Sequence, residues 1–337
     1  SVSAFLLNRS SDLLVEMNIM PVSHLREVIN YFEGKDTIKK QKQISYESLK
    51  HEIIVGTDMS QIKGQKAARR ALEVAAAGGH NMLMIGVPGS GKTMLARCLP
   101  GILPPMSFEE ALETTRIHSI CGKLPPNSGL MVIRPFVAPH HNASVSSLIG
   151  GGQEAKPGEV SVAHNGVLFL DELPEFSRSA LEALRQPLED GIVTVSRVRK
   201  QAIYQSSFML IAAMNPCPCG FYGSTKRICR CTPQETRRYL ERISGPLLDR
   251  IDLQIEVDSV PVQEINTDSP AESSAMVAAR VYAARMIQLE RYRGTGKHCN
   301  AQLSNAEVKK YCTTNSEASC LLDTAVESMH LSMRAYY

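Results

Sequence analysis

Residues 81–99 read NMLMIGVPGSGKTMLARCL, and this stretch decides the fold. The apolar run at 82–85 predicts a buried strand, and the apolar residues that follow Thr93 recur at helical spacing. Between them, Gly86 and the Gly91-Lys92-Thr93 triplet have the spacing of a phosphate-binding P-loop. A strand, a glycine-rich turn and a helix in this order predict an α/β fold with a nucleotide site.

The residue types in the turn predict its chemistry. Glycines let the backbone wrap closely around phosphate oxygens, so that N–H groups and the helix N-terminus point at the anion. Lys92 would then reach the β- and γ-phosphates of ATP, and the Thr93 hydroxyl would hold Mg²⁺. An exposed glycine turn is the alternative, which the flanking strand and helix disfavour. The predicted nucleotide-binding residues here are Gly86, Pro88, Gly89, Ser90, Gly91, Lys92 and Thr93.

Two acidic residues follow a second apolar run, VLFLDE at 167–172. A buried parallel strand that ends in carboxylates places them at the edge where open α/β sheets bind ligands. Asp171 is therefore expected to support Mg²⁺, and Glu172 to polarise the attacking water.

A third apolar run, Phe208–Met214, predicts another buried strand, and Asn215 closes it. An amide in that position can orient the attacking water, although a turn asparagine is the plain alternative. Farther along, Arg250 lies between Asp249 and Asp252. We expect either a local ion pair or an arginine that a neighbouring subunit inserts into a nucleotide site.

Residues 191–204, GIVTVSRVRKQAIY, predict a hairpin with a basic tip. Its cations, Arg197, Arg199 and Lys200, would contact a phosphate backbone without reading bases. A solvated turn is equally compatible with the pattern. Ahead of the P-loop, Ile62 and Gly64 lie in a short turn that could border a nucleotide base, or merely begin a helix.

Four of the nine cysteines are clustered in two pairs, Cys217 with Cys219 and Cys229 with Cys231. Two close pairs on a short loop can converge four thiolates on Zn²⁺. The spacing within each pair is tighter than the usual two-residue gap, so reduced free thiols remain the alternative. The other five cysteines have no pattern and are expected to be reduced.

Composition excludes few functions. The formal net charge of +3 is close to neutral, so any basic surface for nucleic acid must be local. No stretch approaches the length of a membrane span and no signal peptide is present, so we expect a soluble, cytoplasmic protein. The adjacent His140 and His141 are not expected to bind a metal, because neighbouring side chains point in opposite directions.

The periodicity divides the chain into segments. Val22–Phe32 predicts an amphipathic helix, and 34–45 contains a charged linker. Residues 150–158 are glycine-rich and predict a flexible loop. One helix is expected over Ser179–Leu188, and three more after Pro270, over Ala271–Tyr292, from Ser304 to near Cys312, and over Ser316–Met329.

Four motifs, GVPGSGKT, VLFLDE, AAMN and LLDRIDL, together resemble those of AAA+ ATPases. More narrowly, RPFVAPHH, the run from Pro157 to Phe176, and NPCPCG followed by CRCTPQE resemble the Mg-chelatase-like family of these ATPases. The likeness covers residues 20–337. It implies an AAA+ P-loop core, with a parallel sheet flanked by helices, and a C-terminal α-helical lid.

The resemblance also implies domain boundaries. Residues 1–33 would end a Lon-protease-like N-terminal domain, followed by the linker at 34–45. The ATPase core would occupy 46–262, with an insert in its second helix, and the lid 263–337. The implied roles are Walker A for Lys92 and Thr93, Walker B for Asp171 and Glu172, sensor 1 for Asn215, a trans-acting arginine finger for Arg250 and sensor 2 for Arg334.

Two functions follow from this family. In the first, a hexameric motor moves on DNA and drives branch migration during recombination of incoming strands, with the basic hairpin lining its pore. In the second, ATP hydrolysis drives Mg²⁺ insertion into protoporphyrin through partner subunits. The cysteine loop and the trace of an N-terminal domain favour the first.

Overall fold

The computed structural model describes residues 20, 22, 24–38, 46, 56–124, 130–152, 154–197, 200–224, 227–261, 271–329, 332 and 336. Contacts within the chain separate two compact units. One comprises residues 1–54 and 105–133, and the other comprises residues 55–104 and 134–337.

The first unit contains two described helices, α2 (Leu25–Phe32) and α6 (Phe108–Ile120). The predicted helix at 22–32 is thus present and begins at Leu25. A capping box starts α6, because the Ser107 side chain accepts from the Glu110 N–H and the Glu110 carboxylate accepts from the Ser107 N–H.

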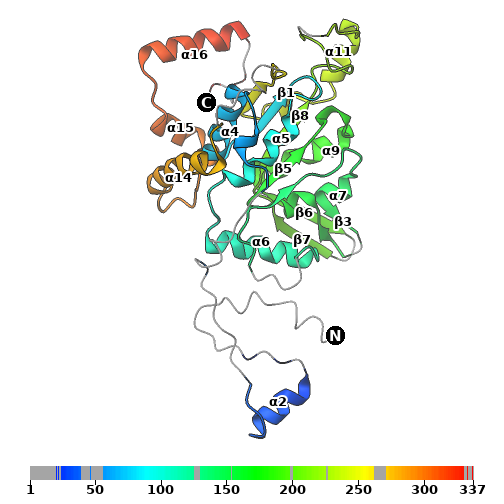
Figure 1. Cartoon of the computed structure of the whole chain (residues 1–337), viewed down its shortest axis with the longest axis vertical. Helices are drawn as coiled ribbons and strands as arrows, with labels where there is room; N and C mark the ends of the chain where they lie inside the picture. The colour runs from blue at the N-terminus through cyan, green and yellow to red at the C-terminus, as the bar shows by residue number, and fades with distance from the viewer. Residues whose placement is uncertain are drawn as a thin grey trace. The chain divides into compact units, whose positions relative to one another are not determined.

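The second unit is built on a five-stranded parallel sheet with the order β2-β5-β8-β1-β9 (Figure 1). This confirms the predicted α/β class with a parallel sheet. In the register, Met84 of β1 lies opposite Ala213 of β8, and Phe169 of β5 lies opposite Ile211 of β8. The strands are β1 (Met82–Ile85), β2 (Phe136–Val137), β5 (Val167–Leu170), β8 (Met209–Met214) and β9 (Leu253–Glu256).

Both faces of the sheet are covered, because successive side chains along each strand enter different cores. Met82 and Met84 belong to one buried cluster, whereas Leu83 between them belongs to the other. Strand β8 alternates in the same way over its six buried residues. Burial on both sides explains why these segments read as continuous apolar runs rather than alternating ones.

Helices α4 (Lys66–Gly78) and α5 (Lys92–Arg97) flank β1 in the sequence. A long helix from the C-terminal region, α14 (Ser274–Arg291), packs against α4 (Figure 1). Val277 and Val281 enter the same core as Leu72. The last two described helices, α15 (Asn305–Tyr311) and α16 (Ser316–Met329), match the predicted helical region.

The segment after β5 differs from its prediction. A single helix is expected from Ser179 to Leu188, but the chain forms α9 (Arg178–Ala183) and α10 (Arg185–Asp190) instead. Pro187 explains the break: it has no N–H for the Ala183 carbonyl, and its ring would collide with that carbonyl in a continuous helix. The prediction of one helix was therefore wrong.

Short elements connect the sheet to its surroundings. The loop predicted as flexible contains an antiparallel pair, β3 (Gly150–Gly151) with β4 (Lys156–Pro157). The predicted hairpin forms from β6 (Ile192–Arg197) and β7 (Lys200–Gln205). The remaining elements are η3 (Met59–Gln61), η4 (Leu99–Gly101), α7 (Val145–Ile149), α8 (Glu159–Val162), η5 (Leu173–Glu175), α11 (Pro233–Leu240), α12 (Gly245–Leu248) and η6 (Asn300–Gln302).

Within the described part of the chain, no helix combines the length and the apolar character that crossing a membrane requires.

Candidate nucleotide-binding site

The glycine-rich turn joins β1 to α5, as predicted. Its first residue, Gly86, donates its N–H to the Met214 carbonyl at 3.1 Å, which ties the turn to the end of β8. A Cβ atom on Gly86 would lie 2.2 Å from the Val257 carbonyl oxygen, so only glycine fits there. The turn is thus fixed to the two strands on either side of β1.

Lys92 lies buried at the start of α5 with its amine inside the turn. Its Nζ donates to the carbonyl oxygens of Gly86 at 2.7 Å and Val87 at 3.0 Å. Burial lowers the pKa of Lys92, and the charge of Asp171 opposes that shift. The cation that would bind phosphate is therefore already placed in the turn.

The carboxyl end of β5 brings the two predicted acids next to the turn. The Thr93 hydroxyl donates to Asp171 Oδ2 at 2.8 Å. Asp171 Oδ1 accepts from the Glu172 N–H at 3.0 Å, while the Glu172 side chain is half exposed. A hydroxyl and a carboxylate in contact form an oxygen donor set of the kind Mg²⁺ prefers.

Sequence reasoning missed a partner of Glu172. His141 Nδ1 lies 3.2 Å from Glu172 Oε2. The sequence predicts only that the histidine pair does not bind a metal, and no spacing rule links residue 141 to residue 172. One signal could have indicated this contact: His141 lies four residues after β2, the strand next to β5.

Asn215 and Arg250 occupy different surroundings. Asn215 Oδ1 lies 3.4 Å from Lys92 Nζ, so the strand-end amide lies beside the amine in the glycine-rich turn. Arg250 forms an ion pair with Glu189 of α10 and donates to the Pro246 carbonyl at 2.7 Å. Arg250 therefore pairs with a glutamate on α10, 61 positions away, rather than with the flanking Asp249 or Asp252.

The predicted base-bordering turn lies beside the P-loop. Ile62 is buried in the core, and Gly64 has φ +61°. The next residue, Gln65, donates through Nε2 to the Ser90 carbonyl at 3.2 Å. A role for Ile62 and Gly64 in nucleotide binding stays a prediction.

The hairpin is anchored at its base. Val193 and Val195 of β6 are buried in the core, and the Tyr204 hydroxyl of β7 donates to the Ala155 carbonyl at 2.8 Å. The side chains of Arg197 and Lys200 lie outside the described part of the structure, as do the whole residues Arg199 and Arg334.

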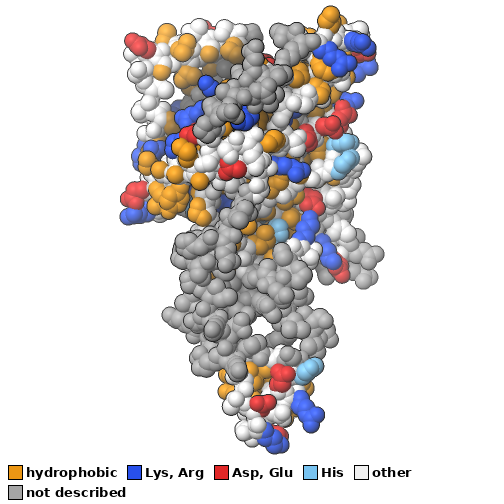
Figure 2. Space-filling view, in the orientation of Figure 1, with side chains coloured by type: hydrophobic (Ala, Val, Ile, Leu, Met, Phe, Trp, Pro, Cys, Tyr) orange, Lys and Arg blue, Asp and Glu red, His pale blue; other side chains and the backbone are white. Residues whose placement is uncertain are grey.

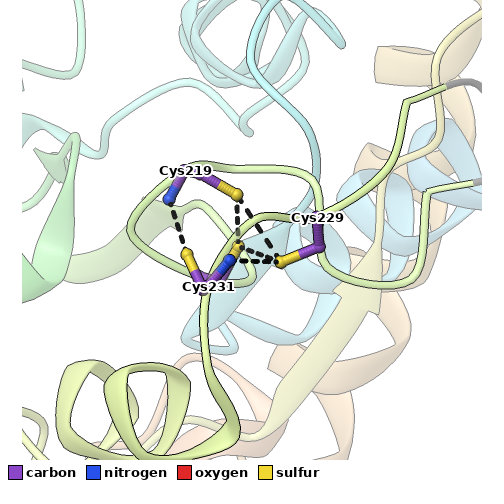
Figure 3. A group of neighbouring side chains, drawn as sticks. Cys219, Cys229 and Cys231 are labelled. Carbon is purple, nitrogen blue, oxygen red and sulfur yellow. Dashed lines mark hydrogen bonds between the residues drawn. The ribbon is translucent and has the colours of Figure 1, made fainter.

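The two cysteine pairs converge on one point. Each of Cys217, Cys219, Cys229 and Cys231 offers a sulfur, and these sulfurs all lie within 4.8 Å of one another. Sγ–Sγ distances are 3.4 Å for Cys217–Cys219 and 3.5 Å for Cys219–Cys229. Figure 3 shows three of the side chains turned toward one another. Backbone N–H groups of Arg230 and Phe221 lower the pKa of Cys219 to about 6, which favours its thiolate.

Exposed arginines lie in the cysteine loop and in α11: Arg227, Arg230, Arg237 and Arg238. Figure 2 shows Lys and Arg atoms gathered over α11.

Comparison with known proteins agrees with the geometry. The family model "Magnesium chelatase, subunit ChlI" matches residues 58–265, and "Magnesium chelatase, subunit ChlI C-terminal" matches residues 271–337. The matched ranges contain the P-loop, both acids, the hairpin and the cysteine cluster.

Individual relatives match over most of the chain. The uncharacterized protein YifB of Escherichia coli is 45% identical over 93% of the chain and 60% of its own length. The competence protein ComM of Haemophilus influenzae is 44% identical over 97% of the chain and 63% of its own length. The magnesium-chelatase 67 kDa subunit of Chlorobaculum parvum is 29% identical over 46% of the chain and 23% of its own length. The chain spans about three fifths of the YifB and ComM relatives, and it belongs to the magnesium chelatase ChlI family of AAA+ proteins.

Proposed function

We propose that the chain is an ATP-hydrolysing motor that acts on DNA as a hexameric ring. In this proposal it resembles competence protein ComM and drives branch migration, as a helicase, during recombination of incoming DNA. ATP and Mg²⁺ are its cofactors.

The hydrolysis step assigns one role to each group at the site. Lys92 exchanges its turn carbonyls for the β- and γ-phosphates, while Thr93 and Asp171 would hold Mg²⁺, which would neutralise phosphate charge. Glu172 accepts a proton from the attacking water, and Asn215 orients that water. The water oxygen bonds to the γ-phosphorus as the bond from that phosphorus to the β–γ bridging oxygen breaks. ADP and phosphate then leave, and Lys92 returns to the carbonyls of the turn.

One observation carries this proposal. Groups from three neighbouring strands meet at the carboxyl edge of the sheet, with Thr93 at 2.8 Å from Asp171 and Asn215 at 3.4 Å from Lys92. Their residue types are those that phosphoryl transfer requires, and the two contacts join residues 78 and 123 positions apart. A structural glycine turn would need neither the acids nor the amide.

DNA contact is supported by the position of the β6–β7 hairpin in the chain. Its sequence carries Arg197, Arg199 and Lys200 at the tip, and its base is buried in the core. The hairpin also lies in the sequence between Glu172 and Asn215, two residues of the proposed hydrolysis site. Cations on such an element bind phosphates without base specificity.

Assembly into a ring is supported by Arg250, which resembles an arginine finger acting on a neighbouring subunit. Subunits carrying Arg250→Ala should be inactive alone, and so should subunits carrying Glu172→Gln. Mixing the two should restore turnover, because an intact site then meets an intact arginine across an interface. Failure of the mixture to regain activity would contradict a finger supplied in trans.

We also propose that the four clustered cysteines hold a structural Zn²⁺ ion. Four thiolates are a common ligand set for structural zinc, and the loop that carries them has few apolar anchors of its own.

The decisive experiment measures ATP turnover with and without forked DNA. Forked DNA should raise turnover severalfold, and Glu172→Gln should bind ATP but lose turnover by about a thousandfold. Reversing Arg197, Arg199 and Lys200 to glutamate should abolish DNA binding and stimulation while leaving ATP affinity unchanged. Lys309→Glu with Lys310→Glu on α15 is the charge-reversal control outside the hairpin. DNA binding retained by the hairpin variant would refute the hairpin assignment.

The alternative is an ATPase that drives Mg²⁺ insertion into protoporphyrin. The partial match to the magnesium-chelatase 67 kDa subunit favours it. An ATP turnover rate that does not change when DNA is added, together with stimulation by porphyrin-chelatase partner subunits, would support this alternative over the DNA motor.

A further inference from the structure

The four clustered sulfurs have the spacing of a metal site. Zinc–sulfur bonds of about 2.3 Å in a tetrahedron place the sulfurs about 3.8 Å apart. Measured Sγ–Sγ distances are 3.4 Å for Cys217–Cys219, 3.5 Å for Cys219–Cys229 and 3.7 Å for Cys217–Cys229. A disulfide would require about 2.05 Å, and all four cysteines are free.

Backbone N–H groups in the loop point at these sulfurs. The Tyr222 N–H donates to Cys217 Sγ at 3.3 Å, and the Cys231 N–H donates to Cys229 Sγ at 3.4 Å. The Cys219 N–H donates to Cys231 Sγ at 3.4 Å (Figure 3). Such contacts orient the ligands of a metal and stabilise their charge. The loop is therefore folded around its sulfurs rather than around an apolar centre.

The same loop touches the nucleotide site on one side. Cys217 is fully buried two residues after Asn215, at the end of β8. A Cβ atom on Gly220 would lie 2.6 Å from the Pro88 ring and 3.8 Å from the Asn215 amide carbon. The backbone of the cysteine loop is thus in close contact with the glycine-rich turn.

On its other side the loop continues into α11, which returns to Asn215. Thr232 follows Cys231 directly and starts α11 with a capping box. Tyr239 of α11 is buried, and its hydroxyl is hydrogen-bonded to the backbone of Asn215. Asn215 is therefore held from two directions by segments that meet at the cysteine cluster.

We propose that Zn²⁺ bound by Cys217, Cys219, Cys229 and Cys231 positions Asn215 and the glycine-rich turn for hydrolysis. The inference rests on the proposed ATPase and zinc site and deepens both. Asn215 is here a positioning residue whose own position depends on the metal cluster. Loss of the metal would release the cysteine loop that packs against Asn215 and Pro88, whereas the basic hairpin is anchored elsewhere, through the hydrogen bond from Tyr204 to Ala155.

The first test measures metal content and its dependence on the cluster. Protein purified without chelator should contain one zinc per chain, and Cys229→Ser with Cys231→Ser should contain none. Cys312→Ser with Cys320→Ser, at two exposed cysteines outside the cluster, is the matched control and should retain the metal. The cluster should also bind Co²⁺ with the absorption of tetrahedral cobalt thiolate. Absence of zinc, together with failure to bind Co²⁺, would overturn the site.

The second test removes the metal reversibly, because the cysteine variant could fail to fold. After chelation and transfer into Mg²⁺ buffer, amide hydrogen exchange is followed at 86–93, 209–222 and the hairpin strands. Exchange should accelerate in the first two segments and stay unchanged in the hairpin, and turnover should fall by about tenfold. Adding Zn²⁺ should reverse both changes.

Unchanged exchange at 86–93 and unchanged turnover in the zinc-free protein would overturn the coupling. DNA stimulation is not among these readouts, so a failure of the DNA proposal leaves the test intact. If the protein never hydrolysed ATP, the metal content and exchange data would still decide the structural claim.

Discussion

Two short loops follow neighbouring strands of the sheet, and they are held by opposite means. The glycine-rich turn after β1 is held together by its own lysine, because two carbonyls of the turn accept hydrogen bonds from the Lys92 amine. The cysteine loop after β8 is instead organised around four sulfurs within 4.8 Å of one another. The cation that organises the first loop is the side chain of Lys92. We infer that the second loop instead requires a bound metal ion.

We infer from this difference that the glycine-rich turn binds the ligand and that the cysteine loop supports the turn. A turn built around an internal cation is ready for an anion, since phosphate oxygens can replace the carbonyls as acceptors. A loop built around thiolates offers no such exchange, and its close contact with Pro88 makes it a support for the first. Two predictions test this comparison of the loops, and a third concerns a contact outside both.

The largest effect is expected from Lys92→Ala. Nucleotide affinity should fall about a hundredfold, equivalent to about 2.7 kcal/mol, because the cation that pairs with the phosphates is removed. Thermal stability should change little, since Lys92 bonds mainly to its own turn. Calorimetric titration with a non-hydrolysable ATP analogue measures the loss, with the exposed Lys66→Ala as control. Affinity within twofold of the parent would mean that the turn does not bind phosphate.

A smaller effect should come from the contact between the loops. Gly220 and Gly223 both have positive φ, +84° and +76°, but only at Gly220 would an added methyl group have neighbours within 4 Å. Gly223→Ala should therefore lose about 1 kcal/mol of stability from backbone strain alone. Gly220→Ala should lose about 2 kcal/mol, because the methyl group also displaces Pro88. Chemical denaturation of both variants measures the difference, and equal losses would contradict a tight contact.

The smallest effect concerns a charged attachment that involves neither loop. Arg280 of α14 donates to Glu73 of α4 at 2.6 Å, and this hydrogen bond holds the pKa of Glu73 below its ordinary value. A lowered carboxyl pKa stabilises the fold above the ordinary pKa, and that stabilisation is lost as pH falls through the lowered value. Glu73→Gln should thus lose about 1.5 kcal/mol at neutral pH and nothing in strong acid. Denaturation across pH, with the exposed Glu327→Gln as control, checks both limits; a loss independent of pH would point to packing instead.

Local patterns predicted most of the fold. The strands at 82–85, 167–170 and 209–214 each read as apolar runs because both of their faces are buried. The capping signal at Ser304 predicted the start of α15, where its side chain pairs with Glu307. These features depend on residues a few positions apart, which is the range that sequence patterns resolve.

Contacts between distant segments could not be predicted in the same way. The sequence predicts that Arg250 either pairs with the acids beside it or acts on a neighbouring subunit. In the structure Arg250 pairs with Glu189, 61 positions away, because the fold brings α10 next to it. His141 meets Glu172 only because β2 and β5 are adjacent in the sheet. The roles of Ile62, Gly64, Arg334 and the hairpin cations stay predictions.

The backbone of Glu172 has a consequence for evolution and engineering. Its φ of +54° is left-handed, a conformation that glycine adopts freely and glutamate does not. A glycine here would relieve about 1 kcal/mol of strain while removing the carboxylate. The single substitution Glu172→Gly should therefore give a more stable protein that has lost ATP turnover. Retention of glutamate at this position would indicate selection for turnover rather than for stability.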